Sequence, residues 1–182
     1  MAILLMRHTR PVLGQDVCYG ALDIELANTF ASDAETAVAT LPTVQRIVAS
    51  PLQRARRLAE NIASRRQLSV HIDERVREMD FGQWEGQPWS ALPRDELDAW
   101  AADFLDAKPH GGECVRAFRD RCLNAMNDYK KHDGTTLIVC HAGVVRAVFA
   151  TGNTADDFKT SIGYGETIAW PDAATRNTSA DE

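Results

Sequence analysis

Three short polar segments each follow an apolar run, and together they hold two arginines and two histidines. The segments carry Arg7 and His8, then Arg54, then His141. An unbroken apolar run is typical of a strand buried on both faces of a parallel sheet, and such sheets bind ligands at the carboxyl ends of their strands. Guanidinium groups bind phosphate, and imidazole accepts and passes on a group near neutral pH. These residue types at these places predict phosphoryl chemistry.

The elements that must position these residues alternate along the chain. Five apolar runs predict strands, with helical segments between them, at residues 2–6, 46–49, 68–72, 135–140 and 167–170. This alternation predicts an α/β fold, namely a three-layer α/β/α sandwich with a mainly parallel central sheet. In such a sheet the three polar segments open on the same edge, beside the N-termini of the helices that follow.

The clearest helix follows the second strand. We expect Ser50 to cap it and Pro51 to occupy its first position. An apolar stripe at helical spacing follows, made of Leu52, Ala55, Leu58, Ala59 and Ile62. Further helices are predicted over residues 114–131, from 143 to about 150, and around 95–104.

Other stretches have no regular period. Residues 10–32 are expected to form a loop, and residues 83–113, which are rich in Pro and Gly, form an excursion that resembles a lid or side wall. Residues 172–182 are small and polar, which predicts a frayed tail. We therefore expect a single domain over residues 1–171.

Composition limits the classes of partner. The chain has 182 residues, with 20 Lys and Arg against 26 Asp and Glu, for a net charge of −6. This balance argues against nucleic acid or an anionic membrane as the main partner. A phosphate site in such a protein must use locally gathered cations. No apolar run is long enough to span a bilayer, and the start of the chain lacks a signal-peptide pattern.

The four cysteines indicate the compartment. They stand at positions 18, 114, 122 and 140, without a C-x-x-C pair or the spacing of a zinc site. The simplest interpretation is four reduced thiols in a cytoplasmic protein. No metal site is predicted.

Each candidate residue also has a purely structural interpretation. Arg7 could be a salt-bridge partner, His8 a hydrogen-bonded core histidine, and Arg54 part of a solvated basic helix face. His141 could belong to an ordinary turn, and Glu78 to an exposed loop. Taken singly, these structural interpretations are the commoner ones. Three polar segments at equivalent strand ends favour a site.

Four motifs in the same order resemble those of the histidine phosphatase superfamily, also called phosphoglycerate mutase-like. An Arg-His pair near the N-terminus is the first of them. The others match the stretches from Ser50 to Ala55, from Glu78 to Gly86, and from His141 to Arg146. The matched region spans about residues 1–150, and the resemblance implies the fold already predicted.

The resemblance also implies a mechanism. His8 is implied as the nucleophile that becomes a phosphohistidine, while Arg7, Arg54 and His141 hold the phosphoryl oxygens. Glu78 is implied as the acid that protonates the leaving oxygen, and a nearby apolar wall would raise its pKa as that role needs. Neutral imidazole can attack phosphorus without prior deprotonation, provided that an acceptor holds its other nitrogen. No metal or other cofactor is implied, because the protein's cations stabilise the charge.

The residues after the Arg-His pair depart from the common family pattern. Thr9 stands where most members carry Gly, and Arg10 and Pro11 follow it. This variant resembles the α-ribazole phosphatase branch, which acts late in cobalamin nucleotide-loop assembly. The short excursion at 83–113 favours a phosphatase over a mutase. A broad-specificity small-molecule phosphatase, a mutase and a phosphate-binding pseudoenzyme stay open as alternatives.

Several further residues are candidates for contact with a small phosphomonoester, which is the expected partner. They are Thr9, Arg10, Tyr19, Gly20, Glu113 and Ala142. Arg10 could equally face solvent. The sequence leaves the oligomeric state open, with a homodimer as one alternative.

Overall fold

The computed structural model describes residues 1–171, so the tail expected at 172–182 lies outside the described residues. In this part of the chain a central sheet has five strands in the order β3-β2-β4-β1-β5. Adjacent strands from β3 to β1 are parallel, and β5 is antiparallel to β1. The strands are β1 Ala2–Arg7, β2 Arg46–Ala49, β3 Val70–Ile72, β4 Thr135–Cys140 and β5 Thr167–Trp170. The prediction of a mainly parallel sheet is confirmed.

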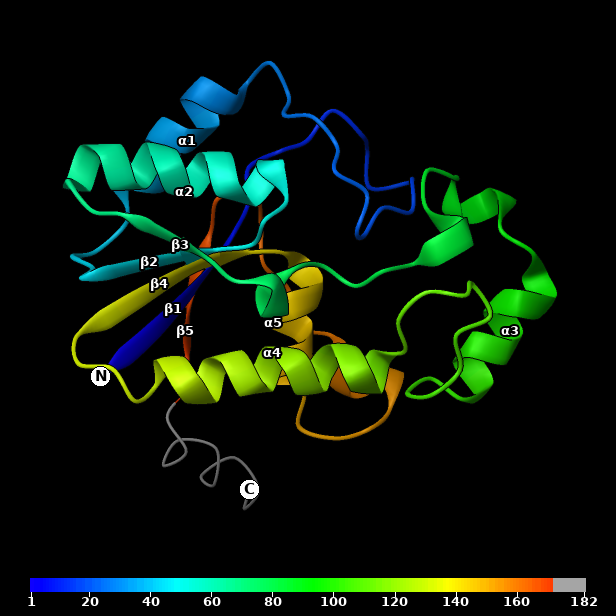
Figure 1. Cartoon of the computed structure of the whole chain (residues 1–182). Coiled ribbons are helices and arrows are strands. Elements are labelled where there is room, and N and C mark those ends of the chain that lie inside the picture. The colour runs from blue at the N-terminus through cyan, green and yellow to red at the C-terminus, as the bar shows by residue number, and fades with distance from the viewer. Residues whose placement is uncertain (172–182) are drawn as a thin grey trace.

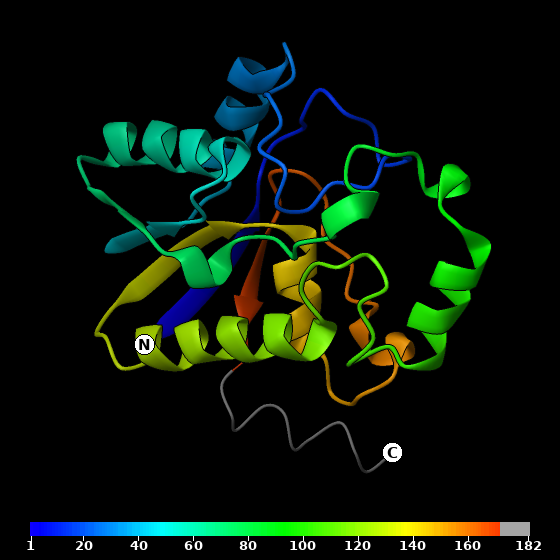
Figure 2. The same cartoon turned by 45° about the vertical axis from the view of Figure 1, so that its right-hand side comes forward.

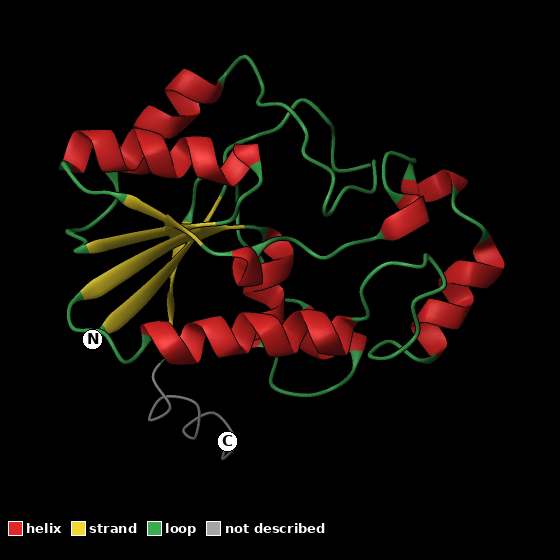
Figure 3. Ribbon diagram, viewed as in Figure 1, coloured by secondary structure: helices red, strands yellow, loops and turns green. Residues whose placement is uncertain are grey.

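Helices cover both faces of the sheet (Figures 1 and 2). One face carries α1 and α2 and the other carries α4 and α5, so the strands in Figure 3 lie between two helical layers. The helices are α1 Phe30–Ala39, α2 Gln53–Arg66, α3 Arg94–Ala102, α4 Val115–Tyr129 and α5 Ala142–Phe149. The predicted three-layer sandwich is confirmed, with helix ends within a few residues of those expected.

Alternate strand residues supply two separate cores. Leu5 and Ile138 face α4 and α5, whereas Met6 and Val139 face α1 and α2. All four side chains are fully buried. Burying a side chain of this size stabilises a fold by roughly 1.5–3 kcal/mol. Apolar burial on both faces explains why the central strands lack polar alternation.

The start of α2 differs from the expectation. The helix begins at Gln53, with Leu52 as its cap, so Ser50 is not the cap and Pro51 is not its first residue. Ser50 is instead fully buried, and its hydroxyl contacts the His141 ring and accepts a hydrogen bond from the Leu52 amide. Ser50 therefore holds the His141 ring at the end of the strands, and the helix starts two residues later than expected.

The loop after β1 packs against the excursion at 83–113. The predicted loop over 10–32 ends at residue 29, where α1 begins. Isolated bridges join Pro11 to Leu26 and Val17 to Pro88. Cys18 from the loop shares a small buried core with Trp84 and Leu92 from the excursion.

The excursion consists of α3 and short 3₁₀ turns, and it lies on the side of the molecule opposite the N-terminus (Figure 1). The turns of the described chain are η1 Glu74–Val76, η2 Gly82–Trp84, η3 Trp89–Ala91 and η4 Ala155–Phe158. Within residues 1–171, no helix is long and apolar enough to cross a membrane.

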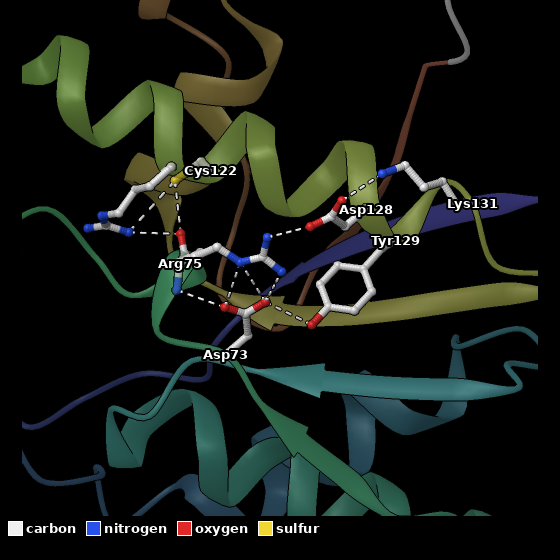
Figure 4. A network of polar contacts seen from close by, with 7 residues as sticks. Asp73, Arg75, Cys122, Asp128, Tyr129 and Lys131 are labelled. Atoms are coloured by element: carbon white, nitrogen blue, oxygen red, sulfur yellow. Dashed lines mark hydrogen bonds and ion pairs between the residues drawn. The ribbon is translucent and has the colours of Figure 1, made fainter.

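A polar network fixes the chain where it leaves β3 (Figure 4). The Asp73 carboxylate accepts hydrogen bonds from the Tyr129 hydroxyl at 2.8 Å and from the Arg75 guanidinium, and Arg75 also pairs with Asp128 on α4 at 2.7 Å. Burial alone would raise the pKa of Asp73, but hydrogen bonds from Arg75 and Tyr129 lower it overall. The network anchors η1 to α4.

We expect Tyr129→Phe to lower the free energy of unfolding by about 1.5 kcal/mol, because it removes a hydrogen bond to a buried charged group. Urea unfolding at neutral pH measures this loss. Lys131→Ala is the control, since Lys131 forms an exposed ion pair with Asp128, and it should cost about 0.5 kcal/mol or less. Equal losses in the two variants would contradict the structural role of the Tyr129 hydroxyl.

Candidate active site

His8 lies directly after β1 with its ring buried. Its Nδ1 lies 2.6 Å from the carbonyl oxygen of Thr9. A carbonyl only accepts, so Nδ1 carries the proton of the neutral ring and Nε2 keeps its lone pair. Burial, followed by the charge of Arg54, lowers the pKa of His8 to about 3. The ring is therefore neutral at physiological pH, with the lone pair of Nε2 free.

His141 lies beside it, at the end of β4 and the start of α5. The two imidazole centroids are 5.2 Å apart. The Nε2 atom of His141 lies 2.8 Å from the Ser50 hydroxyl oxygen, and burial keeps the pKa of His141 well below its ordinary value. When that hydroxyl donates to Nε2, Nδ1 of His141 carries the ring proton and can donate it to an anion.

Two arginines complete a positive pocket without carboxylate partners. Arg7 donates to the carbonyl of Ile162 at 2.8 Å. Arg54, which is fully buried, donates to the carbonyls of Leu22 at 2.8 Å and Gly20 at 2.6 Å. No ion pair within residues 1–171 includes either arginine. Backbone dipoles thus orient both guanidinium groups while their charge stays available to an anion.

Aromatic faces support the same two arginines. The Arg7 guanidinium lies 3.8 Å from the centroid of the Tyr164 ring, and Arg54 lies 5.5 Å from that of Tyr19. The two tyrosine hydroxyls are 3.1 Å apart, and the Tyr164 ring is 5.6 Å from that of His8. The tyrosine pair therefore links the loop after β1 to the segment before β5 across the site.

Unpartnered polar atoms gather at this site. Nine buried side-chain nitrogen or oxygen atoms of the described residues lack a hydrogen-bond partner. Four of the nine belong here, namely Arg7 Nε, Thr9 Oγ1, Arg54 Nε and His141 Nδ1. Buried polar atoms are nearly always hydrogen-bonded, so such a cluster indicates a site for a polar ligand.

Glu78 carries the acidic group of the site. Its carboxylate accepts hydrogen bonds from the amides of Met79 at 3.0 Å and Gly143 at 3.1 Å. Burial raises the pKa of Glu78, although those amides, Arg54 and Arg121 oppose the shift. A Cβ on residue 143 would collide with the carboxylate, so a larger residue there would displace Glu78 from the start of α5. A carboxyl with a raised pKa can hold a proton for transfer.

A pocket of about 360 Å³ adjoins these groups. Arg7, Tyr19 and Glu78 face into it from the site. Its wall is strongly aromatic, with contributions from the excursion, α4 and η4, and includes Phe81, Trp89, Trp100, Phe104, Phe118 and Phe158. The pocket therefore joins a charged end to an apolar end.

The structure brings Arg7, His8, Arg54, Glu78 and His141 together, as the motifs predict. The other candidates contribute in different ways. The carbonyl of Thr9 contacts the His8 ring and that of Gly20 holds Arg54, while Tyr19 and Ala142 line the pocket.

Two candidates lie elsewhere. Arg10 is exposed and pairs with Asp33 at 2.7 Å, outside the pocket. Glu113 also lies outside the pocket wall and pairs with Arg121 at 2.8 Å. Glu113 instead lines a separate hollow that it shares with Glu78 and Arg121.

Sequence reasoning missed three contributors. Ser50 lies within a recognised motif but was assigned to the helix cap. Tyr164 and Arg121 lie outside the motifs, and only the tertiary fold reveals their contacts. No group of three or more His, Cys, Asp or Glu side chains in the described chain could hold a metal ion.

A family model for the histidine phosphatase superfamily (branch 1) matches residues 3–160. The chain belongs to this superfamily. The residues that converge in the structure are those of the superfamily motifs, so the match and the geometry concern the same part of the chain.

Relatives with curated functions differ in their substrates. An adenosylcobalamin/alpha-ribazole phosphatase of Escherichia coli (strain K12) is 32% identical over 110 residues, which cover 57% of this chain and 54% of that protein. A glucosyl-3-phosphoglycerate phosphatase of Mycolicibacterium vanbaalenii is 31% identical over 163 residues, covering 80% of this chain and 72% of that protein. In sequence, the chain thus spans about half the length of the curated alpha-ribazole phosphatases that it matches.

A solved structure of a relative is similar to this one over more of the chain than the sequence alignments cover. The alpha-ribazole phosphatase from Shigella flexneri has a TM-score of 0.79 and is 28% identical, covering 93% of this chain and 89% of that one. The fold of the superfamily therefore extends through nearly all of the sequence.

The directions of these pKa shifts lead to a prediction about pH. If neutral His8 attacks the substrate and Glu78 donates a proton, activity should be highest at acidic pH. As pH falls, activity is lost only towards the His8 pKa of about 3. As pH rises, activity declines above the Glu78 pKa, which is raised above the ordinary 4.5. Profiles of kcat/KM against pH test this, and Glu78→Gln should abolish the enzyme's descending limb because an amide does not titrate. An unchanged descending limb in that variant would assign the limb to another group.

Proposed function

We propose that this protein hydrolyses small phosphomonoesters through a phosphohistidine at His8. The observation that carries the proposal is the convergence of two arginines without carboxylate partners on a neutral histidine whose Nε2 is available for attack. Fixed cations of this kind stabilise the charge that develops on a transferring phosphoryl group.

The first step transfers the phosphoryl group to the enzyme. Nε2 of His8 forms a bond to phosphorus while the bond from phosphorus to the ester oxygen breaks. Glu78 gives its proton to that oxygen, so the product leaves as a neutral alcohol. Proton donation to a poor leaving group typically accelerates a reaction by roughly 10²–10⁴-fold.

The second step regenerates the enzyme. The Glu78 carboxylate takes a proton from water as the water oxygen attacks phosphorus and the bond from phosphorus to Nε2 breaks. Inorganic phosphate departs, His8 is neutral again, and Glu78 is protonated again. The carboxyl thus alternates between acid and base, and its raised pKa suits both tasks.

Arg7, Arg54 and His141 hold the three phosphoryl oxygens throughout. An attraction between unit charges about 4 Å apart is worth on the order of 4 kcal/mol at an effective dielectric constant near 20. The protein's own cations and His141 would supply this stabilisation, and the family resemblance implies no metal or other cofactor. Removing one such donor typically costs roughly 10²–10³-fold in rate.

We assign α-ribazole phosphate as the first substrate to examine. Its leaving group carries a planar aromatic base, and aromatic side chains favour offset or edge contacts with such rings. Phe81, Trp89 and Trp100 supply that surface beside the phosphate end. The sequence variant after His8 and the likeness to alpha-ribazole phosphatases support the same substrate.

A broader or different phosphatase specificity is the second candidate. The alignment with the glucosyl-3-phosphoglycerate phosphatase covers more of this chain than that with the alpha-ribazole phosphatase. A mutase is less well supported, because it must keep water from its phosphohistidine and the excursion here is short. A protein that only binds phosphate would gain nothing from Glu78, since a carboxylate beside an anion repels it.

We further place this activity in the cytoplasm, without a nucleic-acid or membrane partner. The four cysteines are free thiols, which supports a reducing compartment. The net charge of −6 supports a small-molecule partner over a polyanion.

A side-by-side panel of kcat/KM values tests the proposed function. It includes α-ribazole phosphate, glucosyl-3-phosphoglycerate and a simple aryl phosphate, with His8→Ala as the matched control. We expect hydrolysis of all three by the wild-type chain, with the highest kcat/KM for α-ribazole phosphate. His8→Ala should lose at least ~10³-fold because it removes the nucleophile.

The outcomes separate the two levels of the proposal. A higher kcat/KM for a different ester would overturn the substrate assignment but keep the phosphatase. Undiminished turnover by a correctly folded His8→Ala would overturn the mechanism. Phosphate binding without hydrolysis of any ester would favour the pseudoenzyme.

A further inference from the structure

One side chain outside the pocket holds the backbone that carries Glu78. Arg121 on α4 donates through Nη1 to the carbonyls of Arg75 at 2.9 Å and Arg77 at 2.7 Å. Through Nη2 it donates to the carbonyl of Glu78 itself at 3.1 Å. A single guanidinium thus satisfies three carbonyls over four consecutive residues, from η1 into the irregular chain that follows it.

Glu113 orients that guanidinium. Its two carboxylate oxygens accept hydrogen bonds from Nε and Nη2 of Arg121, each at 2.8 Å. The side chains of Arg121 and Glu113 are only 23% and 20% exposed. A two-point contact between planar groups of this kind sets orientation as well as distance. The excursion that contributes Glu113 is thereby coupled to the segment that carries Glu78.

Other contacts hold the two ends of this segment. Upstream, the network in Figure 4 anchors Asp73 and Arg75 to α4. Downstream, the Glu78 carboxylate depends on the amides of Met79 and Gly143. Between these two anchors, Cys122 also donates to the carbonyl of Arg75, whereas Arg121 donates to the carbonyls of Arg77 and Glu78 as well.

We propose that Arg121, oriented by Glu113, is a positioning residue that places the Glu78 carboxyl for proton transfer to the leaving group. Neither Arg121 nor Glu113 lines the aromatic pocket. Both line a separate, polar hollow that shares Glu78 with it. The inference rests on the proposed phosphatase function and on the role of Glu78 in it.

The physical reason is the narrow tolerance of proton transfer. Donor and acceptor must come within about 2.6–3.2 Å of each other, and a displacement near 1 Å can cost about 10²-fold in rate. Lysine at position 121 would keep the charge, but its three donors on one nitrogen cannot reproduce the planar contact with Glu113 and three carbonyls. The backbone at Glu78 would then lose its fixed place.

The test compares two substrates whose leaving groups differ in their need for a proton. An alkyl phosphate needs proton donation, whereas p-nitrophenyl phosphate releases a stable anion without it. We expect Arg121→Lys to lower kcat/KM for the alkyl phosphate at least ~10-fold more than for p-nitrophenyl phosphate. Glu113→Gln should shift the ratio in the same direction by a smaller factor.

Two reference variants make the result specific. Arg116→Lys is the matched control, because Arg116 lies on the same helix and holds Asp106 by two hydrogen bonds of 2.6 Å without touching the Glu78 segment. Its substrate ratio should equal that of the wild type. Glu78→Gln shows the full loss of proton donation. Thermal melts confirm that each variant is folded. The ratio of kcat/KM for the two substrates is then compared, because a smaller fraction of active enzyme lowers both values equally and leaves their ratio unchanged.

The outcomes distinguish failure of the inference from failure of the proposed function. Suppose that Glu78→Gln changes the ratio, but folded Arg121→Lys and Glu113→Gln lower kcat/KM equally for both substrates. Arg121 is then only structural, and the inference is overturned. If Glu78→Gln leaves the ratio unchanged, the assigned role of Glu78 fails and the inference falls with it. A ratio shift as large in Arg116→Lys as in Arg121→Lys would also overturn the inference.

Discussion

The site depends on the positive charge of two arginines that have no ion-pair partner among the described residues. Arg54 is fully buried and Arg7 is half-buried, and backbone carbonyls and the faces of Tyr19 and Tyr164 hold them. Burial, followed by the charges of Arg54 and Arg7, lowers the pKa of His8 and keeps its ring neutral. Under the proposed function, the same two arginines bind the phosphoryl group that His8 attacks.

The sheet brings these groups together through register. Arg7 at the end of β1 pairs with Cys140 at the end of β4, so the residues that follow, His8 and His141, leave the sheet side by side. β2 lies on the other side of β4 and delivers Ser50 to the same edge. Glu78 reaches this edge from irregular chain and needs separate supports. The strands therefore define the phosphate end, and the contacts of α4 and α5 define the acidic end.

Sequence predicted the parts of the site that follow from strand ends and motifs. The apolar runs located the strands, and the shared edge of a parallel sheet placed Arg7, Arg54 and His141 together before any contact was known. The acceptor required at the second nitrogen of the nucleophile proved to be the Thr9 carbonyl. Backbone carbonyls carry no sequence signal, so the identity of this partner could not be predicted.

The remaining differences have the same origin in tertiary contacts. Ser50 has a good capping side chain, but its hydroxyl bonds His141 and α2 starts later. Glu113 is a sequence candidate for substrate contact, yet it pairs with Arg121, which no local pattern distinguishes from the other arginines of α4. Tyr164 comes from an irregular segment more than 150 residues from Arg7, and sequence spacing says nothing about their stacking.

The most direct test of the account is capture of the covalent intermediate. The wild-type chain is mixed with a ³²P-labelled phosphomonoester, quenched within milliseconds without acid, digested, and mapped by mass spectrometry, since phosphohistidine is labile to acid. The account predicts stoichiometric label on His8, lost on acid treatment and absent from His8→Ala. Steady hydrolysis with no label on His8 at any time, or label on another residue, would contradict it.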